Sequence, residues 1–286
     1  MKAIVTGSAG FIGGHLMRTL QAEGHDVVGV DLKNGKDTRD TKLMKQLFAG
    51  ATYVFHLAAL PRVQYSIEQP TETHDHNVNG TLSVLLAARD AEVERVIYSA
   101  SSSAYGNSPV LPLTEDLPAH PISPYGLQKY VGELYCRLLW DVYGLPTVSL
   151  RYFNIYGPGA SAEGAYALVI AKFIKQRLEG SPMTITGDGE QTRDFTHVRD
   201  VVRANVLAAT SKRVGKGEVI NIGAGKNASV NRVAQLIGGP TEHIAPRLEP
   251  RDTLADNSLA KALLGWEPEV SLEEGISELK HLHNLP

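Results

Sequence analysis

Cysteine and long apolar runs are both scarce in this sequence, and each scarcity excludes a class of protein. Cys136 is the only cysteine among 286 residues, so no internal disulfide can form, and the composition suits a reducing compartment. No apolar run is long enough to span a bilayer, and the chain enters an apolar segment at Ala3 without a basic, apolar leader. We therefore expect a soluble, cytoplasmic protein with no membrane partner.

An excess of positive charge is also missing. The sequence has 28 Lys and Arg against 31 Asp and Glu, and its formal net charge of −3 creates no field for a polyanion. Nucleic acid is therefore not expected as a partner. His74 and His76 flank Asp75, but residues two apart do not face one ion, so no metal site is expected. The hydrophobic share of 43% and the charged share of 21% are ordinary for a globular protein.

The first 31 residues contain a strand, a glycine-rich loop, a helix, a second strand and an acid. In the loop Thr6-Gly7-Ser8-Ala9-Gly10-Phe11-Ile12-Gly13, Gly7 and Gly10 would let the backbone approach a pyrophosphate at the helix N-terminus. Gly13 would let the helix lie close to the strand, and Asp31 would accept hydrogen bonds from both ribose hydroxyls, which favours NAD over NADP. The alternative is a glycine turn in an ordinary βαβ unit, against which the position of Asp31 argues.

Strand and helix patterns alternate along most of the chain. After Asp31 we expect strands at residues 52–59, 94–99, 146–150 and 219–222, and helices at 41–48, 78–91, 125–143 and 197–210. This alternation predicts an α/β fold of the Rossmann type, a doubly wound parallel sheet covered on both faces. Past Gly157 the elements become shorter, which indicates a smaller C-terminal α/β substrate lobe. We expect the NAD-binding domain at 1–157 plus 197–224 and the lobe at 158–196 plus 225–286.

Polar side chains capable of acid–base chemistry follow several expected strands. Ser101, the Tyr125/Lys129 pair and Asn154 would lie outside the carboxyl ends of the sheet, where ligands bind in such folds. Tyr125 and Lys129 are four residues apart and share a helix face, and Ser123 is a suitable N-cap for that helix. We expect the Lys129 ammonium and the positive nicotinamide ring together to lower the pKa of Tyr125, so that it can exchange a proton with a substrate hydroxyl. The alternative is a pair that serves only the packing of an amphipathic helix.

A series of motifs over nearly the whole length extends this reading. They are the glycine loop, Asp37-Thr38-Arg39-Asp40, His56-Leu57-Ala58-Ala59, Asn77-Val78-Asn79-Gly80-Thr81, Ser101-Ser102-Ser103-Ala104-Tyr105-Gly106, Tyr125 with Lys129, Arg151-Tyr152-Phe153-Asn154-Ile155-Tyr156-Gly157-Pro158, Arg193-Asp194-Phe195 and Leu264-Gly265-Trp266. With these motifs the chain resembles the extended short-chain dehydrogenase/reductases that act on nucleotide sugars. Among them it looks most like the UDP-glucose 4-epimerases.

The resemblance implies a role for each matching residue. Tyr125 would be the catalytic acid/base, assisted by Lys129, and Ser101 would bind the sugar's 4-hydroxyl with help from Ser102 or Ser103. The residues expected to bind NAD are Gly7, Gly10, Phe11, Ile12, Gly13, Asp31, Asp37, Thr38, Leu57, Ala58, Ala59, Asn77, Ser99, Tyr125, Lys129 and Tyr152. The residues expected to bind the UDP-sugar are Ser101, Ser103, Asn154, Arg193, Arg247 and Arg251.

Two departures from the family pattern affect the assignment of these roles to residues of this sequence. Only five residues separate Asp31 from Asp37, which trims the wall expected around the adenine. The usual Arg-Pro-Gly-Glu reads Arg247-Leu248-Glu249-Pro250-Arg251, so Arg247 and Arg251 are alternative ligands for the diphosphate. Residues 159–166 are expected to line the sugar pocket, and the sequence does not identify the sugar.

The choice of reaction follows from residues that the chain does not have. Within the family, 4,6-dehydratases carry an Asp-Glu pair after the Ser/Thr, and decarboxylases carry a glutamate in that stretch. Here the positions read Ser102-Ser103, so the resemblance implies 4-epimerisation through a 4-keto intermediate, with NAD retained. The alternatives are a dehydratase or keto-sugar reductase, or a regulator that binds NAD without turnover. Family members pair two helices across a dimer axis, so a homodimer is expected.

Overall fold

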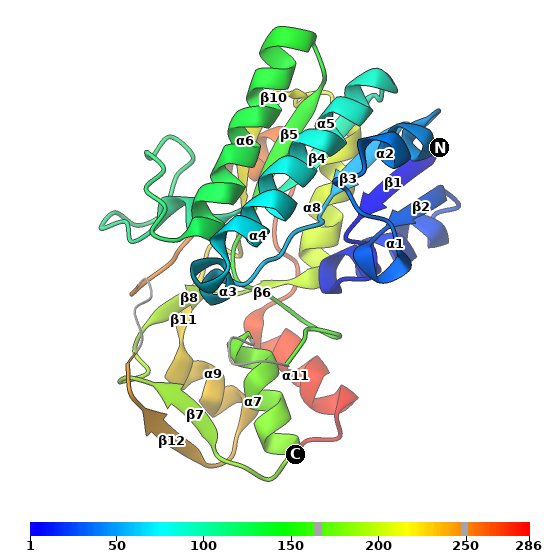
Figure 1. Ribbon diagram of the computed structural model, residues 1–286. Helices are drawn as coiled ribbons and strands as arrows, with labels where there is room; N and C mark the ends of the chain where they lie inside the picture. Colours follow the sequence, from blue (N-terminus) through cyan, green and yellow to red (C-terminus); the bar gives the residue numbers. More distant parts are fainter. Residues whose placement is uncertain (163–167, 247–250) are drawn as a thin grey trace.

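A six-stranded parallel sheet forms the centre of the larger domain (Figure 1). The computed structural model describes residues 1–162, 168–246 and 251–286. The strand order is β10-β5-β4-β3-β1-β2, and every neighbouring pair is parallel. The strands are β1 (Lys2–Thr6), β2 (Asp26–Val30), β3 (Tyr53–His56), β4 (Arg95–Ser101), β5 (Thr147–Tyr152) and β10 (Lys216–Ile222). The predicted Rossmann-type sheet is therefore confirmed.

Helices cover both faces of this sheet. On one face α2 (Thr41–Phe48), α5 (Gly80–Asp90) and α6 (Pro124–Tyr143) bury apolar side chains against β3 and β4. On the other face α1 (Phe11–Ala22), α8 (Val198–Thr210) and α10 (Ser258–Leu264) pack on the sheet in a second apolar cluster. Strands buried on both faces are apolar throughout, which explains the short continuous runs of the sequence. Among the described residues, no helix is both long and apolar enough to cross a membrane.

A smaller lobe lies below the carboxyl ends of the strands in the view of Figure 1. Its apolar cluster joins α7 (Val169–Leu178), α9 (Val230–Ile237) and α11 (Leu272–Leu282) to strand β7 (Met183–Thr186), which pairs with β12 (Thr241–Ile244). Two further pairs lie near the sheet domain: β8 (Thr192–Asp194) with β11 (Asn227–Ser229), and β6 (Ile155–Tyr156) with β9 (Thr196–His197).

One part of the predicted lobe packs elsewhere. Residues 225–286 were all expected in the smaller lobe, but Ala260, Leu264 and Trp266 are buried in the cluster beneath the sheet. The Trp266 indole Nε1 donates to the carbonyl oxygen of Asp200 on α8 at 2.9 Å. The segment around α10 is thus attached to the sheet domain, because its apolar face covers α8.

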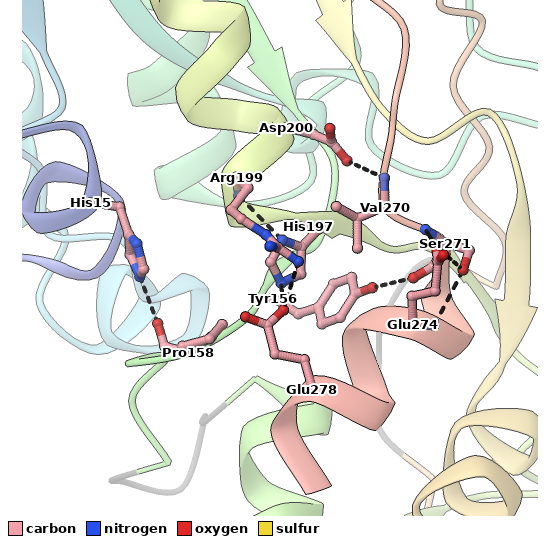
Figure 2. A network of polar contacts seen from close by, with 10 residues as sticks. All are labelled: His15, Tyr156, Pro158, His197, Arg199, Asp200, Val270, Ser271, Glu274 and Glu278. Atoms are coloured by element: carbon pink, nitrogen blue, oxygen red, sulfur yellow. Dashed lines mark hydrogen bonds and ion pairs between the residues drawn. The ribbon is translucent and has the colours of Figure 1, made fainter. Parts of the chain in front are cut away.

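Buried polar contacts fasten the C-terminal helix α11 to the junction between the two parts (Figure 2). Tyr156 donates its hydroxyl to the carbonyl of Ser271 at 3.2 Å, and the Asp200 carboxylate accepts the backbone N–H of Val270 at 3.1 Å. The fully buried ring of His197 lies 3.3 Å from the carboxylate of Glu278. These contacts fix α11 against β6, β9 and the start of α8.

The helix expected at 78–91 begins earlier than its pattern indicates. The chain runs from α3 (Val63–Glu68) into α4 (Pro70–His74), passes through the π-helical segment η2 (Asp75–Asn79), and continues as α5. A π turn inserts one residue into the helical repeat and shifts the phase of the apolar pattern. The sequence pattern therefore shows α5 clearly but not the turn before it.

Candidate active site

The glycine-rich loop between β1 and α1 has the close backbone approach that its sequence predicts. Gly7 has φ +72°, and a Cβ there would lie 2.8 Å from the backbone nitrogen of Ala58. A Cβ on Gly13 would lie 2.1 Å from the carbonyl oxygen of Gly7. Gly10 is the N-cap of α1 and provides no side-chain capping bond, so the first N–H groups of this helix are available to a ligand. The cradle fits a pyrophosphate.

Asp31 follows β2 at the edge of a pocket beside this loop. Its carboxylate accepts the N–H of Ala9 at 3.0 Å and the N–H of Lys33 at 2.9 Å, which fixes its orientation. Each oxygen retains a lone pair that could accept a ribose hydroxyl. Predicted residues that line the pocket are Gly7, Asp31, Thr38, Ala58 and Ala59, and further lining residues, which the motifs did not indicate, are Leu32, Lys36, Leu60 and His76.

Asp37 and Thr38, expected together at the adenine, are placed differently. Thr38 lines the pocket, whereas both oxygens of Asp37 lie against Arg39, whose Nε donates to them at 3.0 and 3.1 Å. The hydrogen bonds from Arg39 lower the pKa of Asp37. Arg39 also pairs with Asp75, so an ion-pair network holds the shortened segment that is expected beside the adenine. A direct contact between Asp37 and the adenine stays a prediction.

A chain of buried hydrogen bonds positions the loop after β3. The Thr6 hydroxyl oxygen accepts the N–H groups of Leu57 and Ala58, both at 3.1 Å, and lies 2.7 Å from His56 Nδ1. Thr6 must therefore donate its proton to Nδ1, which leaves Nε2–H to donate to Thr81 Oγ1 at 2.9 Å. This chain requires a neutral imidazole. Burial and, to a smaller extent, the charge of Lys129 lower the pKa of His56 to about 3.

Acid should weaken the fold through His56. Because its pKa falls from 6.5 to about 3 on folding, its contribution to stability is complete above pH ~6.5 and is lost as pH falls toward ~3. Between pH ~6.5 and ~4.5 we expect a loss of about 3 kcal/mol from this group. Chemical denaturation of the parent and of His56→Gln at several pH values measures it. Equal slopes for the two proteins would contradict the assignment.

Tyr125 lies in the first turn of α6, as expected. Ser123 caps this helix by accepting the N–H of Gly126 at 3.1 Å, with Pro124 as the first helical residue. The Tyr125 N–H donates to Ser66 Oγ at 3.0 Å, which ties the turn to α3. The Tyr125 phenol lies near enough to Ser101, the last residue of β4, for Ser101 to lower its pKa. The structure thus places the predicted acid/base next to the predicted sugar-binding serine.

The remaining serines extend this polar edge. The Ser101 hydroxyl lies 3.1 Å from that of Ser103 and accepts the N–H of Ser103 at 3.2 Å. Ser102 starts the short 3-10 segment η3 (Ser102–Tyr105) and is half-buried. Three hydroxyl-bearing residues therefore stand at the carboxyl end of β4.

Lys129 does not lower the pKa of Tyr125 in this structure, and the lowering expected from Lys129 and the nicotinamide ring together stays a prediction. Burial raises the pKa of Tyr125, and the nearby Ser101 is what opposes this rise. The Lys129 ammonium lies 4.5 Å from the centroid of the Tyr98 ring, and burial lowers the pKa of Lys129 to about 8. The reason is desolvation: a site dry enough to strengthen charge–charge attraction also disfavours each charge. Tyr125 is therefore a neutral phenol near pH 7.

A buried ion pair next to Lys129 was not anticipated. Glu133 is one helical turn beyond Lys129, and its carboxylate accepts Arg151 Nε at 3.0 Å and Nη2 at 2.7 Å. Both side chains are at most 4% exposed, and Arg151 also stacks 4.5 Å from the centroid of the Tyr105 ring. The Glu133 charge raises the pKa of Lys129 against the effect of burial. The available signal was a charged residue within a strand buried on both faces.

Three residues expected at the cofactor have other partners in the structure. Tyr152 is 7% exposed, belongs to the core cluster beneath the sheet, and accepts Asn205 Nδ2 at 2.8 Å. Ser99 is buried and lies near enough to Tyr152 to lower the pKa of its phenol. The Asn77 side chain bonds to Leu60 and Gln128. Direct contacts of these three with NAD stay predictions.

The residues expected to bind the diphosphate gather where β5, β8 and the segment after residue 250 meet. Asn154 has φ +36°, and its Nδ2 donates to the carbonyl of Asp194 and to Thr253 Oγ1, both at 3.2 Å. Arg193 Nη1 donates to the carbonyl of Arg251 at 3.1 Å, and the Arg251 guanidinium reaches Asp188 at 3.2 Å. Arg247 and part of the expected 159–166 wall lie outside the described residues.

Asp194 holds these segments together. Its carboxylate accepts the N–H groups of Ala224 at 2.7 Å, Gly225 at 3.0 Å and Ala255 at 3.0 Å. Three backbone donors from two separate segments converge on one fully buried side chain. The family motif Arg193-Asp194-Phe195 thus combines a candidate phosphate ligand with the residue that fixes its surroundings.

Comparison with known proteins agrees with this geometry. The model of the NAD dependent epimerase/dehydratase family matches residues 3–223. The chain belongs to this family. Its cofactor is NAD, and the glycine cradle, the free helix N-terminus and Asp31 fit that dinucleotide.

Two solved structures and one further relative resemble the whole chain. The UDP-glucose 4-epimerase of Mycolicibacterium smegmatis is 36% identical over 306 residues, with 97% of each chain covered. The structure of UDP-glucose 4-epimerase with UDP-glucose from Thermotoga maritima superposes with a TM-score of 0.93 at 37% identity and covers 99% of each chain. UDP-glucuronic acid 4-epimerase from Bacillus cereus, solved with UDP-glucuronic acid and NAD, has a TM-score of 0.89 at 34% identity, covering 99% of this chain and 100% of that one.

Proposed function

We propose that this protein is a UDP-sugar 4-epimerase of the UDP-glucose/UDP-galactose type. The observation that carries the proposal is the placement of Tyr125, in the first turn of α6, next to Ser101 at the carboxyl end of β4. An acid/base and a hydroxyl-binding residue that lie next to each other can act on one sugar hydroxyl. The similarity to UDP-sugar 4-epimerases over nearly the full length supports the same assignment.

The chain's own groups divide the work. Bound NAD supplies the reversible oxidation and reduction at C4 of the sugar. Tyr125 must first lose its own proton; as the phenolate it receives the proton of the 4-hydroxyl when the ketone forms, and as the phenol it returns that proton when the alcohol is restored, while Ser101 holds the oxygen. The Lys129 ammonium, one turn along the same helix, favours the transient phenolate. Asn154, Arg193 and one of the two alternatives Arg247 and Arg251 hold the diphosphate, so that the keto-sugar can turn without leaving.

The other reactions of the family need groups that these positions lack. Elimination or decarboxylation requires a carboxylate after Ser101, and both following residues, Ser102 and Ser103, are serines. The nearest buried carboxylate on α6, Glu133, is held by both arms of Arg151 and cannot take a proton from a sugar. Epimerisation requires only the acid/base and NAD.

Turnover of defined sugars tests the proposal. The protein is incubated with UDP-glucose and with UDP-galactose, and product mass and anomeric NMR signals are followed. Altered configuration at C4 with unchanged mass is the expected result. Loss of water would indicate a dehydratase, and a lack of turnover on UDP-glucose, UDP-glucuronate or UDP-N-acetylglucosamine would favour a regulator that binds NAD. Parallel assays of these three sugars identify the preferred substrate.

We also propose that α6 forms the homodimer interface. Four apolar residues follow one another along its exposed side: Leu127, Leu134, Leu138 and Val142, which are 51%, 50%, 48% and 59% exposed. Spacings of seven, four and four residues keep them on one helical stripe, and an exposed apolar stripe of this length is typical of a contact surface.

Negative charges on this apolar stripe of α6 are expected to dissociate the homodimer. Leu134→Glu and Leu138→Glu together place two carboxylates at the centre of the proposed contact and are expected to convert dimers into monomers, as read by light scattering. Leu178→Glu is the control, because Leu178 is equally exposed, at 51%, but lies on α7 in the other lobe. A parent protein that is monomeric at micromolar concentration would refute the interface.

A further inference from the structure

Gln128 stands directly before Lys129, yet its side chain points to a different segment of the protein. It is 3% exposed, and its amide makes three hydrogen bonds. Its Oε1 accepts Asn77 Nδ2 at 2.8 Å, and its Nε2 donates to Thr73 Oγ1 at 3.0 Å and to the carbonyl of Pro70 at 3.4 Å. All its partners belong to the helical segment 70–79. One amide therefore connects the helix that carries Tyr125 and Lys129 to this segment.

Asn77 continues the connection to the cofactor pocket. Its Oδ1 accepts the N–H of Leu60 at 2.7 Å, and its Nδ2 donates to the carbonyl of Leu60 at 3.2 Å as well as to Gln128. One side chain thus satisfies both backbone groups of Leu60, as a neighbouring strand would. Leu60 lines the pocket together with Ala58 and Ala59. Asn77 lies in the π turn η2, a local irregularity that is frequent at functional sites.

We propose that Gln128 and Asn77 are positioning residues, which together set the backbone at Leu60 relative to the catalytic helix α6. This inference rests on the proposed function, because it concerns the alignment of the acid/base with NAD. Asn77 then acts through Leu60 instead of binding the nicotinamide end itself. A buried polar network of this kind is stable only when every member is bonded, so loss of one amide releases the others. A shift of about 1 Å between reacting groups is sufficient to slow turnover strongly.

A double-mutant cycle distinguishes action through Leu60 from direct binding. Gln128→Ala and Asn77→Ala should each lower kcat by roughly 10- to 100-fold, and each should weaken NAD binding by a similar factor. The double variant should lose no more than the worse single variant, because both substitutions break the same bridge. If Asn77 instead contacts NAD directly, Asn77→Ala would weaken NAD binding while Gln128→Ala would leave it at the parental value, and the proposal would be overturned.

Matched variants control for unspecific damage. Gln176 on α7 also bonds through both amide atoms, donating to Thr184 Oγ1 at 3.0 Å and accepting the Thr184 N–H at 3.1 Å, so Gln176→Ala should leave kcat and NAD affinity at parental values. Gln128→Met has nearly the parental length without the hydrogen bonds and serves where the alanine variant unfolds. It should reproduce the loss.

Hydrogen exchange at the Leu60 amide gives a readout that does not depend on sugar turnover. Exchange should accelerate in Gln128→Met and Asn77→Ala but not in Gln176→Ala. A parent that turns over no nucleotide sugar would refute the proposed function, while NAD affinity and Leu60 exchange would still test the bridge. Parental kcat, NAD affinity and Leu60 exchange in Gln128→Met would refute the bridge alone.

Discussion

Replacing Tyr125 by phenylalanine is expected to lower kcat by roughly 10²- to 10⁴-fold, the range for loss of a general acid/base. The substitution removes one oxygen from a half-buried ring that lies next to Ser101, and it leaves the glycine cradle intact. Bound NAD should therefore remain at the parental level. The measurement is the rate at which UDP-galactose becomes UDP-glucose, together with the NAD content of the purified protein.

Tyr130→Phe is the matched control for this experiment. Tyr130 lies on the same helix, and its substitution removes the same atom outside the proposed machinery. Parental turnover is expected there. If Tyr125→Phe interconverted the two sugars as fast as its parent, the proton would have to move through another group, and the assignment of Tyr125 would fail.

The neutral phenol found here changes how Tyr125 is expected to work. The sequence led us to expect that Lys129 and the nicotinamide ring together would lower the pKa of Tyr125, but residue spacing contains no information about burial. The structure shows that burial raises the pKa of Tyr125 and lowers that of Lys129. Ser101 is thus the group that opposes this rise, and Tyr125 must lose its own proton before it can accept the proton of the sugar's 4-hydroxyl.

Local sequence patterns predicted most of the sheet domain, because the spacing of apolar residues reflects which side chains are buried. The apolar runs at β1 and β2 and the amphipathic pattern at α2 reproduce the observed bounds closely. The glycine loop and Asp31 were predictable for the same reason, since their roles depend on backbone positions a few residues apart. The pairing order of the strands adds long-range information, and it appears only in the structure.

Interactions between distant segments account for what the sequence did not reveal. Gln128 reads as an ordinary helical residue, yet its partners lie 51 to 58 positions earlier. Glu133 and Arg151 are 18 positions apart and pair only because α6 packs on β5. Trp266 was assigned to the wrong part for the same reason, because its contact with α8 spans 66 positions. Such pairs are set by topology, which a local pattern does not encode.

Replacing Lys129 by methionine is expected to have opposite effects on activity and stability. Methionine removes the ammonium that favours the transient phenolate, so kcat should fall by roughly 10²-fold or more. Stability should increase, because Lys129 is 2% exposed and burial lowers its pKa from 10.5 to about 8. At pH ~7 the folded protein holds this charge at a cost of about 3 kcal/mol, which methionine does not incur.

The difference in stability between the parent and Lys129→Met should depend on pH in a defined direction. The folded protein releases the Lys129 proton at about pH 8, while the unfolded chain keeps it to about pH 10.5. Unfolding therefore takes up a proton between these values, and the parent gains stability relative to Lys129→Met as pH rises through this window. Denaturant unfolding of both proteins from pH ~7 to ~10 measures the difference, which should shrink toward zero. If Lys129→Met were less stable than its parent at pH ~7, the ammonium, which lies near Glu133 and the Tyr98 ring, would stabilise the fold. Lys129 would then not be a position where stability is lost in exchange for activity.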